Sequence, residues 1–232
     1  MTTQVDFHFD VMCPWAYQTS VWIRAAAGQR DLAVQWRFFS LEEVNRQPGK
    51  KHPWEREWSY GWSMLRVAAL LRRRPEPDGN AAVDRFYRVA GRMLHEDGVK
   101  VHSPDGMRAV LREIGEDPAL VDAATADPTT HDDVRTDHDE VVALGGFGVP
   151  TLVIHPDHTC PEPTTLFGPV VTPAPTGEEA GRLWDAVAAW RAFPHLYELR
   201  RPKTEEDWRH IQAGFSPYLN ARDWQTIQTP VA

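Results

Sequence analysis

The sequence predicts an α/β protein in which a run of helices interrupts a small sheet. Three observations support this fold class. The first forty residues read as a strand, a helix and a second strand, residues 46–146 carry helical signals, and residues 147–195 read as two strands followed by a helix. The chain is therefore expected to form one sheet from two distant segments.

The first strand is indicated by Val5, Phe7 and Phe9, which alternate with polar residues. This is the period of a strand with one buried face. A helix is expected over residues 15–27 and a second strand over residues 33–40. Because a strand, a helix and a strand in such a short stretch form a βαβ unit, the two strands should be parallel.

Cys13 stands at the junction of the first strand and its helix. Pro14 has no N–H to leave unpaired and its φ suits a first helical turn, so the helix should begin there. A thiol at a helix N-terminus has its pKa lowered, typically into the range of roughly 3.5 to 7.5. The sequence thus predicts a reactive thiolate, and the alternative is a small buried residue that happens to precede a helix.

Residues 46–146 read as a module of four or five helices. Ser103, Asp117 and Asp127 each precede a proline, which is typical of a helix start, and Asn80 is expected to cap another helix. No repeat or low-complexity tract interrupts the module.

The chain then returns to the sheet with strands expected over residues 151–155 and 164–167. Thr176 followed by Glu179 predicts a capping box at the start of the last helix of this part. The order of elements is that of a thioredoxin fold with an inserted all-helical domain.

The expected division of the chain follows from this order. Residues 1–45 and 147–195 form the thioredoxin-like domain, residues 46–146 form the helical insertion, and residues 196–232 form a tail. The tail keeps several aromatic residues, so it should pack on the body or on a second subunit. Its aromatic residues are Tyr197, Trp208, Phe215 and Trp224.

The composition of the chain limits the classes of partner that it could bind. The formal net charge of −8 argues against nucleic acid and anionic membranes as partners, and no apolar run is long enough to span a bilayer. With no leader pattern at the N-terminus, a cytoplasmic protein is expected. No metal is expected either, since His155, His158 and Cys160 on a proline-rich turn make an incomplete ligand set. A homodimer is left open.

Pro150 lies at the start of a predicted strand, between Val149 and Thr151. Proline cannot donate to a central ladder, so this position indicates a cis bond or a bulge. In a thioredoxin-like sheet it would face Cys13, and the backbone of Val149 could pair with an extended thiol ligand. The alternative is an ordinary trans turn.

The chain resembles the DsbA-like mycothiol-dependent reductases of actinobacteria from about residue 5 to about residue 204. The resemblance is carried by C-P-W at residues 13–15, G-V-P-T at 148–151, F-G-P-V at 167–170 and the block at 177–185. It implies a nucleophilic Cys13 and a low-molecular-weight thiol, mycothiol or a similar molecule, as co-substrate, with no tightly bound cofactor. Members are described as reducing disulfides or small nitro-aromatic compounds.

The resemblance also implies site residues. Pro14, Trp15, Val149, Pro150 and Thr151 would contact the substrate or the thiol. A family histidine near the active site matches His95, which could donate to a bound group or receive the thiol proton. A histidine in the last turn of a helix also complements the helix dipole, so a structural role for it is an alternative.

One departure from the family pattern limits the mechanism. The family has C-P-W-C, and this chain has Ala16 at the position of the second cysteine. Cys160 lies at a turn roughly 15 Å of extended chain from Pro150, too far for a disulfide with Cys13. A redox reaction would therefore use one protein thiol. A thiol transferase, an enzyme like the 2-hydroxychromene-2-carboxylate isomerases, and a non-catalytic binding protein remain alternatives.

Overall fold

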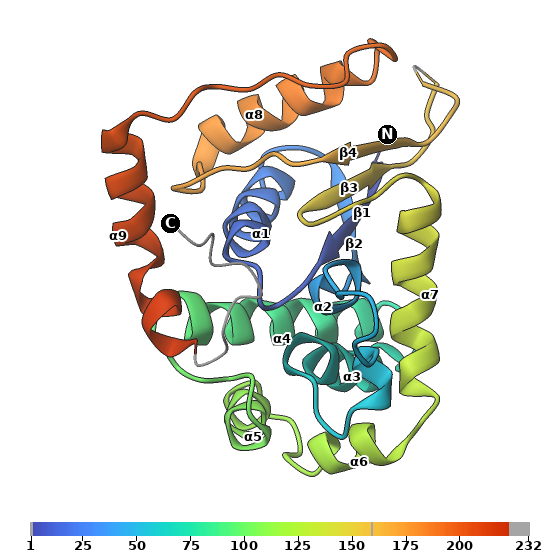
Figure 1. The fold of residues 1–232 in the computed structure, drawn as a ribbon. Coiled ribbons are helices and arrows are strands. Elements are labelled where there is room, and N and C mark those ends of the chain that lie inside the picture. Colours follow the sequence, from blue (N-terminus) through green and yellow to red (C-terminus); the bar gives the residue numbers. More distant parts are fainter. Residues whose placement is uncertain (1, 159, 223–232) are drawn as a thin grey trace.

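The computed structural model describes residues 2–158 and 160–222 (Figure 1). Its sheet has four strands in the order β2-β1-β3-β4. β1 and β2 are parallel, whereas β3 is antiparallel to both β1 and β4. The strands are β1 (Thr3–Phe9), β2 (Leu32–Phe38), β3 (Thr151–Ile154) and β4 (Thr164–Phe167).

The helices follow the predicted order, with the inserted helices between β2 and β3. Of the helices in the described residues, α1 follows β1, five longer helices and two short ones follow β2, and two follow β4. They are α1 (Pro14–Ala27), α2 (Leu41–Val44), a 3₁₀ turn (Pro53–Glu55), α3 (Tyr60–Arg72), α4 (Asp78–His95), α5 (Pro104–Glu113), α6 (Leu120–Ala126), α7 (Thr130–Ala143), α8 (Gly177–Trp190) and α9 (Glu205–Ala221). The chain therefore has a thioredoxin-like fold with an all-helical insertion, as the sequence predicts.

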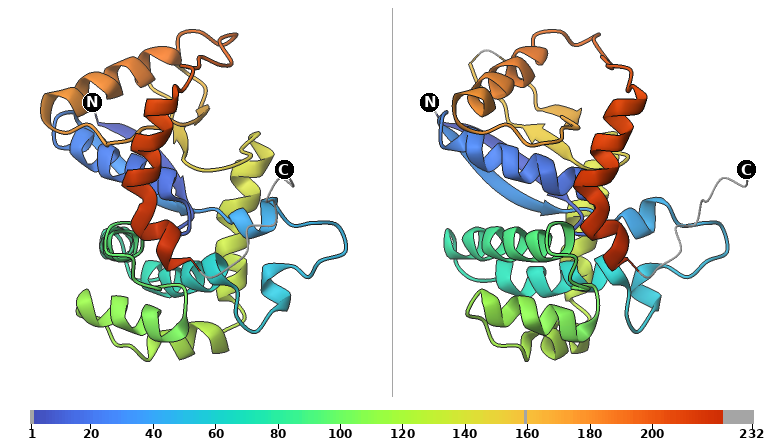
Figure 2. Two further views of the ribbon diagram at one scale, coloured as in Figure 1. Left: turned by 60° about the vertical axis from the view of Figure 1, so that its left-hand side comes forward. Right: turned by 90° about the vertical axis from the view of Figure 1, so that its left-hand side faces the viewer.

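α1 and α8 pack against each other beside the sheet (Figure 2). Trp22 of α1 is fully buried against Trp184 of α8. Its indole N–H donates to the carbonyl of Ala180 at 3.1 Å, so this large ring of α1 is fully buried without leaving a polar atom unpaired.

An aromatic cluster joins the sheet to the inserted helices. Phe9 of β1 stacks on Tyr87 of α4 with ring centroids 4.0 Å apart, and Trp36 of β2 meets Tyr87 edge-on at 5.6 Å. All three side chains are buried. The hydrophobic face predicted from the alternation in β1 is thus buried against the insertion rather than against α1 alone.

The free edge of β2 is covered by polar side chains of the inserted helices. Asn80 of α4 accepts from the N–H of Trp36 at 3.0 Å and donates to the carbonyl of Val34 at 2.9 Å. Asp137 of α7 accepts from the N–H of Phe38 at 2.9 Å. These side chains satisfy an edge that would otherwise be open to pairing with another chain.

Asn80 is therefore not the helix cap that the sequence predicts. α4 begins two residues earlier, at Asp78, and the Asn80 side chain is directed at the sheet. In the sequence, a helix cap and a side chain that pairs with a strand edge look alike, because each is a polar residue just before an apolar stripe. Only the docking of α4 on β2 distinguishes the two roles.

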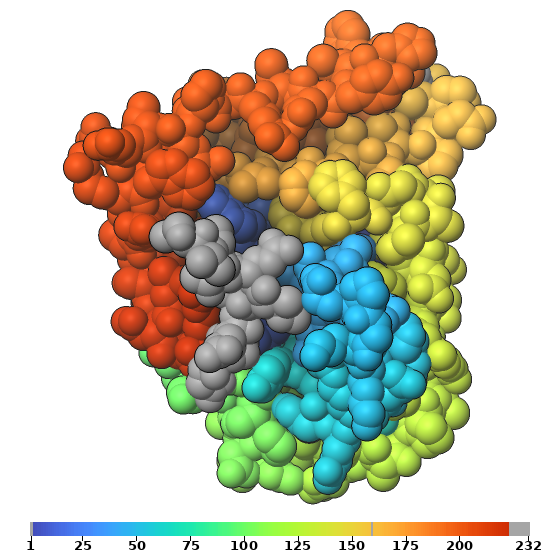
Figure 3. All heavy atoms as spheres, in the orientation of Figure 1, coloured from blue at the N-terminus to red at the C-terminus, as the bar shows by residue number. Residues whose placement is uncertain are grey.

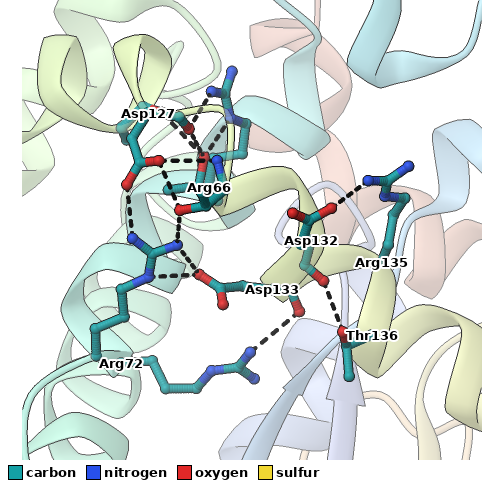
Figure 4. Close-up of polar contacts among 11 residues, drawn as sticks. Arg66, Arg72, Asp127, Asp132, Asp133, Arg135 and Thr136 are labelled. Carbon is teal, nitrogen blue, oxygen red and sulfur yellow. Dashed lines mark hydrogen bonds and ion pairs between the residues drawn. The ribbon is translucent and has the colours of Figure 1, made fainter.

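Charged side chains hold α3 against α7 (Figure 4). The buried guanidinium of Arg66 donates to the hydroxyl of Thr130 at 2.8 Å and to the carbonyl of Asp127 at 3.1 Å. Arg72 pairs with the carboxylate of Asp137 and donates to the carbonyl of Asp133 at 3.2 Å. Arg72, at the C-terminal end of α3, is therefore paired with groups of α7.

Two other predicted helix starts differ from the structure. The carboxylates of Asp117 and Asp127 accept from the N–H groups of Ala119 and Thr129, each at 2.9 Å, so they form turns before α6 and α7 instead of capping them. Thr176 is the N-cap residue of α8, but its side chain makes no capping hydrogen bond, so the predicted capping box is wrong. The predicted start at Ser103 is confirmed.

We expect Asn80→Ala to lower the free energy of unfolding by about 1–3 kcal/mol, because it leaves a donor and an acceptor of β2 unpaired. Urea unfolding monitored by tryptophan fluorescence measures this loss. Asn45→Ala is the matched control, since the Asn45 amide bonds to one carbonyl at an exposed site. Equal stability of the two variants would show that Asn80 does not hold the strand edge.

Candidate active site

Cys13 is the N-cap residue of α1, as the sequence predicts. Its sulfur accepts a hydrogen bond from the N–H of Ala16 at 3.4 Å. The thiol donates to the carbonyl of Val149 at 3.5 Å. The first helical turn and the segment before β3 therefore meet at the sulfur, although they are far apart in the sequence.

The segment opposite the sulfur is held in place by hydrogen bonds. The Val149–Pro150 peptide bond is cis. Thr151 donates its hydroxyl proton to the carbonyl of Gly148 at 2.7 Å, and the N–H of Gly168 donates to the carbonyl of Pro150 at 2.8 Å. The loop is thus tied to the start of β3 and the end of β4.

Burial decides the protonation of the Cys13 thiol. The residue is only 7% exposed. Burial raises the pKa of the thiol to about 12, and the nearby Asp10 carboxyl adds to this rise, whereas the hydrogen bond from the N–H of Ala16 acts in the opposite direction. The prediction of an acidic thiol is therefore wrong for this structure, because the cost of burying a charge exceeds the stabilisation that a helix N-terminus provides.

Asp10 is a site residue that sequence reasoning missed. Its carboxyl is fully buried and accepts from the N–H of Met12 at 2.9 Å and from the N–H of Leu41 at 2.8 Å. Burial raises its pKa to about 7. A charged residue between Phe9 and an apolar stretch was the available signal, since a carboxyl at the end of a buried strand needs local N–H partners.

His95 lies at the end of α4 and is buried beside the cysteine segment. Its Nε2 lies 2.8 Å from the carbonyl of Val11, two residues before Cys13, so Nε2 carries the proton. The ring stacks on Tyr17 with centroids 5.0 Å apart. Burial lowers the pKa of His95 to about 4, so the imidazole is neutral near pH 7. This contact supports a positioning role, and a catalytic role for His95 stays a prediction.

Aromatic residues of α9 form one side of the site. Phe215 packs edge-on against Trp15 with ring centroids 4.8 Å apart, and Tyr218 lies 5.0 Å from the ring of His95. Figure 2 shows α9 passing the end of α1 that carries the cysteine. The packing of this part of the predicted tail on the body is thus seen, although its fourth aromatic residue, Trp224, lies outside the described residues.

The other predicted site features lie elsewhere. Cys160 is a free cysteine whose sulfur lies 3.8 Å from the hydroxyl of Thr164 and 3.9 Å from the carbonyl of Arg191.

Among residues 2–158 and 160–222, no three His, Cys, Asp or Glu side chains are grouped as metal ligands would be. In the same part of the chain, each helix is too short or too polar to cross a bilayer.

A thioredoxin-like sheet with a helix-capping cysteine opposite a proline loop and an all-helical insertion defines a DsbA-like thioredoxin fold. Solved structures share the fold. Oxidoreductase DsbA from Xylella fastidiosa aligns with a TM-score of 0.53 and 16% identity, over 82% of this chain and 87% of that chain. A 2-hydroxychromene-2-carboxylate isomerase aligns with a TM-score of 0.54 and 14% identity, over 80% of this chain and 93% of that one.

The chain belongs to the Rv2466c-like family, described as mycothiol-dependent nitroreductase Rv2466c, whose model matches residues 12–201. It is also 52% identical over 225 residues to the uncharacterized protein Rv2286c of Mycobacterium tuberculosis (strain ATCC 25618 / H37Rv), with 97% of this chain and 93% of that protein covered. The resemblance found in the sequence is confirmed. The protein is a thiol-dependent oxidoreductase.

The raised pKa of Cys13 predicts its alkylation profile. In a Cys160→Ser background, the rate with iodoacetamide should keep rising from about pH 7 to about pH 10 without a plateau, because the thiolate fraction grows across this range. Stopped reactions analysed by intact mass give the rate. A half-maximal rate near pH 7 would show that the thiol is acidic in solution.

The raised pKa of Asp10 predicts a pH-dependent stability. Between about pH 4 and pH 7 the folded protein keeps a proton on Asp10 that the unfolded chain has lost, so the free energy of unfolding should fall as pH rises. The decline is at most about 1.4 kcal/mol per pH unit. Asp10→Asn should remove this component of the slope.

Urea unfolding at several pH values compares Asp10→Asn with the parent. Asp139→Asn is the control, since it removes an exposed carboxylate on α7 by the same chemical change. A parent and an Asp10→Asn variant with parallel pH profiles would contradict the assignment.

Proposed function

We propose that the protein carries out its redox reaction through the single thiol of Cys13, with mycothiol or a similar low-molecular-weight thiol as co-substrate. One observation carries this proposal. The fourth position of the motif places the backbone N–H of Ala16 at 3.4 Å from the sulfur, and the side chain there holds no second sulfur. The other cysteine, Cys160, contacts Thr164 and Arg191. A mixed disulfide on Cys13 must therefore be resolved by a small thiol.

The reaction can be written with one protein sulfur. After Cys13 loses its proton, the thiolate attacks one sulfur of a disulfide, forms a mixed disulfide and releases the other half as a thiolate. A small thiolate then attacks the mixed disulfide, joins the bound half and frees Cys13. For a nitro-aromatic compound, two small thiols would supply two electrons and two protons, giving the nitroso compound, one disulfide and water.

The positions around the sulfur suit a thiol ligand. The carbonyl of Val149 now accepts from the Cys13 thiol and could accept instead from a bound ligand. Pro14, Trp15, Pro150 and Thr151 border the same point, and we retain them as contacts of the substrate or the thiol. His95 would hold the carbonyl that precedes the cysteine turn.

The cellular compartment, the partners and the domain division are also part of the proposal. An unpaired reactive thiol with a small-thiol co-substrate suits the reducing cytoplasm. We infer small-molecule partners, without nucleic acid or membrane, and leave a homodimer open. The division into a thioredoxin-like domain (residues 1–45 and 147–195), a helical insertion (46–146) and a tail (196–232) is also retained as a proposal.

A thiol transferase or an isomerase that binds a small thiol is the second candidate. The observation that favours it is the protonated, buried Cys13, whose raised pKa suits hydrogen bonding to a ligand better than attack on one. In that case Cys13 would orient the small thiol and would not bond to it.

Intact-mass measurement separates the candidates. Incubation with mycothiol disulfide should add one mycothiol to the parent, and excess mycothiol should remove it. Cys13→Ser should take no adduct, and Cys160→Ser should behave as the parent. Ala16→Cys should replace the adduct with the loss of two hydrogens, because the new thiol can resolve the mixed disulfide within the C-P-W-C pattern.

Turnover assays complete the test. Under the proposal, Cys13→Ser should lose mycothiol-dependent reduction of a disulfide and of a nitro-aromatic compound. Conjugation of an electrophile that survives in Cys13→Ser would instead establish the transferase. Tight thiol binding with neither adduct nor turnover would contradict the proposal.

A further inference from the structure

α9 lies beyond residues 12–201, the segment that the family model matches. One face of this helix is nevertheless buried, through Ile211, Phe215, Tyr218 and Ala221. The spacing of these residues is that of a single helical stripe. The buried stripe shows that α9 is packed on the body of the protein, next to the family's cysteine.

Phe215 ties the middle of α9 to the first turn of α1. It is 7% exposed, and its ring meets that of Trp15 edge-on. Trp15 is the second residue after Cys13, so Phe215 is one side chain away from the cysteine turn. Edge-to-face ring pairs of this kind are favourable beyond the area that they bury.

Tyr218 lies one turn further along the stripe. It is 8% exposed and its ring packs against that of His95. The backbone of α9 at this point also approaches the end of α4, because a Cβ on Gly98 would lie 3.2 Å from the carbonyl oxygen of Pro217. The helix is therefore seated closely, and Tyr218 reaches the cysteine segment through His95, whose Nε2 donates to the carbonyl of Val11.

In Figure 3, dark-blue atoms of the N-terminal segment are visible beside α9, which is red, and the neighbouring orange segment. The thiol itself is 7% exposed. A ligand must therefore pass side chains of the surrounding elements to reach Cys13, and α9 contributes aromatic rings there.

We propose that Phe215 and Tyr218 determine which molecules reach Cys13, favouring a flat aromatic ring over a peptide. A flat ring can insert between aromatic side chains and gain the same contacts that they make with each other. A peptide carries backbone N–H and C=O groups that would be left unpaired among these rings. This proposal names the substrate class of the site and rests on the proposed function.

The test uses three iodoacetamides that share one leaving group and differ in shape: iodoacetamide, N-phenyliodoacetamide and an iodoacetyl tripeptide. Second-order rates are measured on folded Cys160→Ser protein, so that Cys13 is the thiol that reacts. Because the thiolate fraction is common to all three reagents, it cancels in the ratio of rates. Normalisation to the same reagents with free cysteine removes their intrinsic differences.

The parent should favour the phenyl reagent over the tripeptide, and Phe215→Ala/Tyr218→Ala should reduce this ratio about tenfold. Trp208→Ala is the matched control on α9, since Trp208 is 51% exposed, and it should keep the parental ratio. Phe215→Leu/Tyr218→Leu removes both rings but keeps most of the apolar side-chain volume, and it should also reduce the ratio. This pair tests the proposal if the alanine pair folds poorly.

An unchanged ratio in folded alanine and leucine pairs would overturn the proposal. Alkylation requires no disulfide exchange, so the test is independent of the redox chemistry. If Cys13→Ser retained turnover while the ratio still fell in the α9 variants, the proposed function would fail and the role of α9 in access would stand.

Discussion

The buried carboxyl of Asp10 is the interaction on which the site depends. It binds the N–H of Met12, in the turn leading to Cys13, and the N–H of Leu41, just after β2. The two parallel strands thus end at one carboxyl. α3 approaches so closely that a Cβ on Gly61 would lie 2.8 Å from the Asp10 Oδ1 atom. The sheet, the cysteine turn and the inserted helices are therefore positioned by one polar group that has no access to water.

This arrangement explains why Cys13 is at a helix N-terminus and yet is held as a thiol. A helix terminus stabilises a thiolate through nearby N–H groups, but removal of water from the sulfur and a carboxyl nearby favour the neutral form. His95 is likewise held neutral by burial. In the resting site, the Cys13 thiol and the His95 imidazole are therefore uncharged. Cys13 becomes reactive only when it loses its proton.

Much of the fold could be predicted because its signals are local. Alternation in β1, the cap at Ser103 and the strand from Thr164 to Phe167 each depend on a few neighbouring residues. Asn80 shows where local reasoning ends. The same side chain can cap a helix or pair with a strand edge, and its role depends on which element lies within hydrogen-bonding distance. That distance is set by the packing of α4 on β2.

By itself, the sequence determined the order of elements, the family, and the presence of Ala16 where a second cysteine would stand, because these are properties of the chain read along its length. Only the tertiary structure decided the protonation of Cys13, the role of Asp10 and the placement of Phe215 and Tyr218 at the site. Desolvation depends on every atom packed around a group, and around Cys13 those atoms come from segments as distant as α1, α7 and β3.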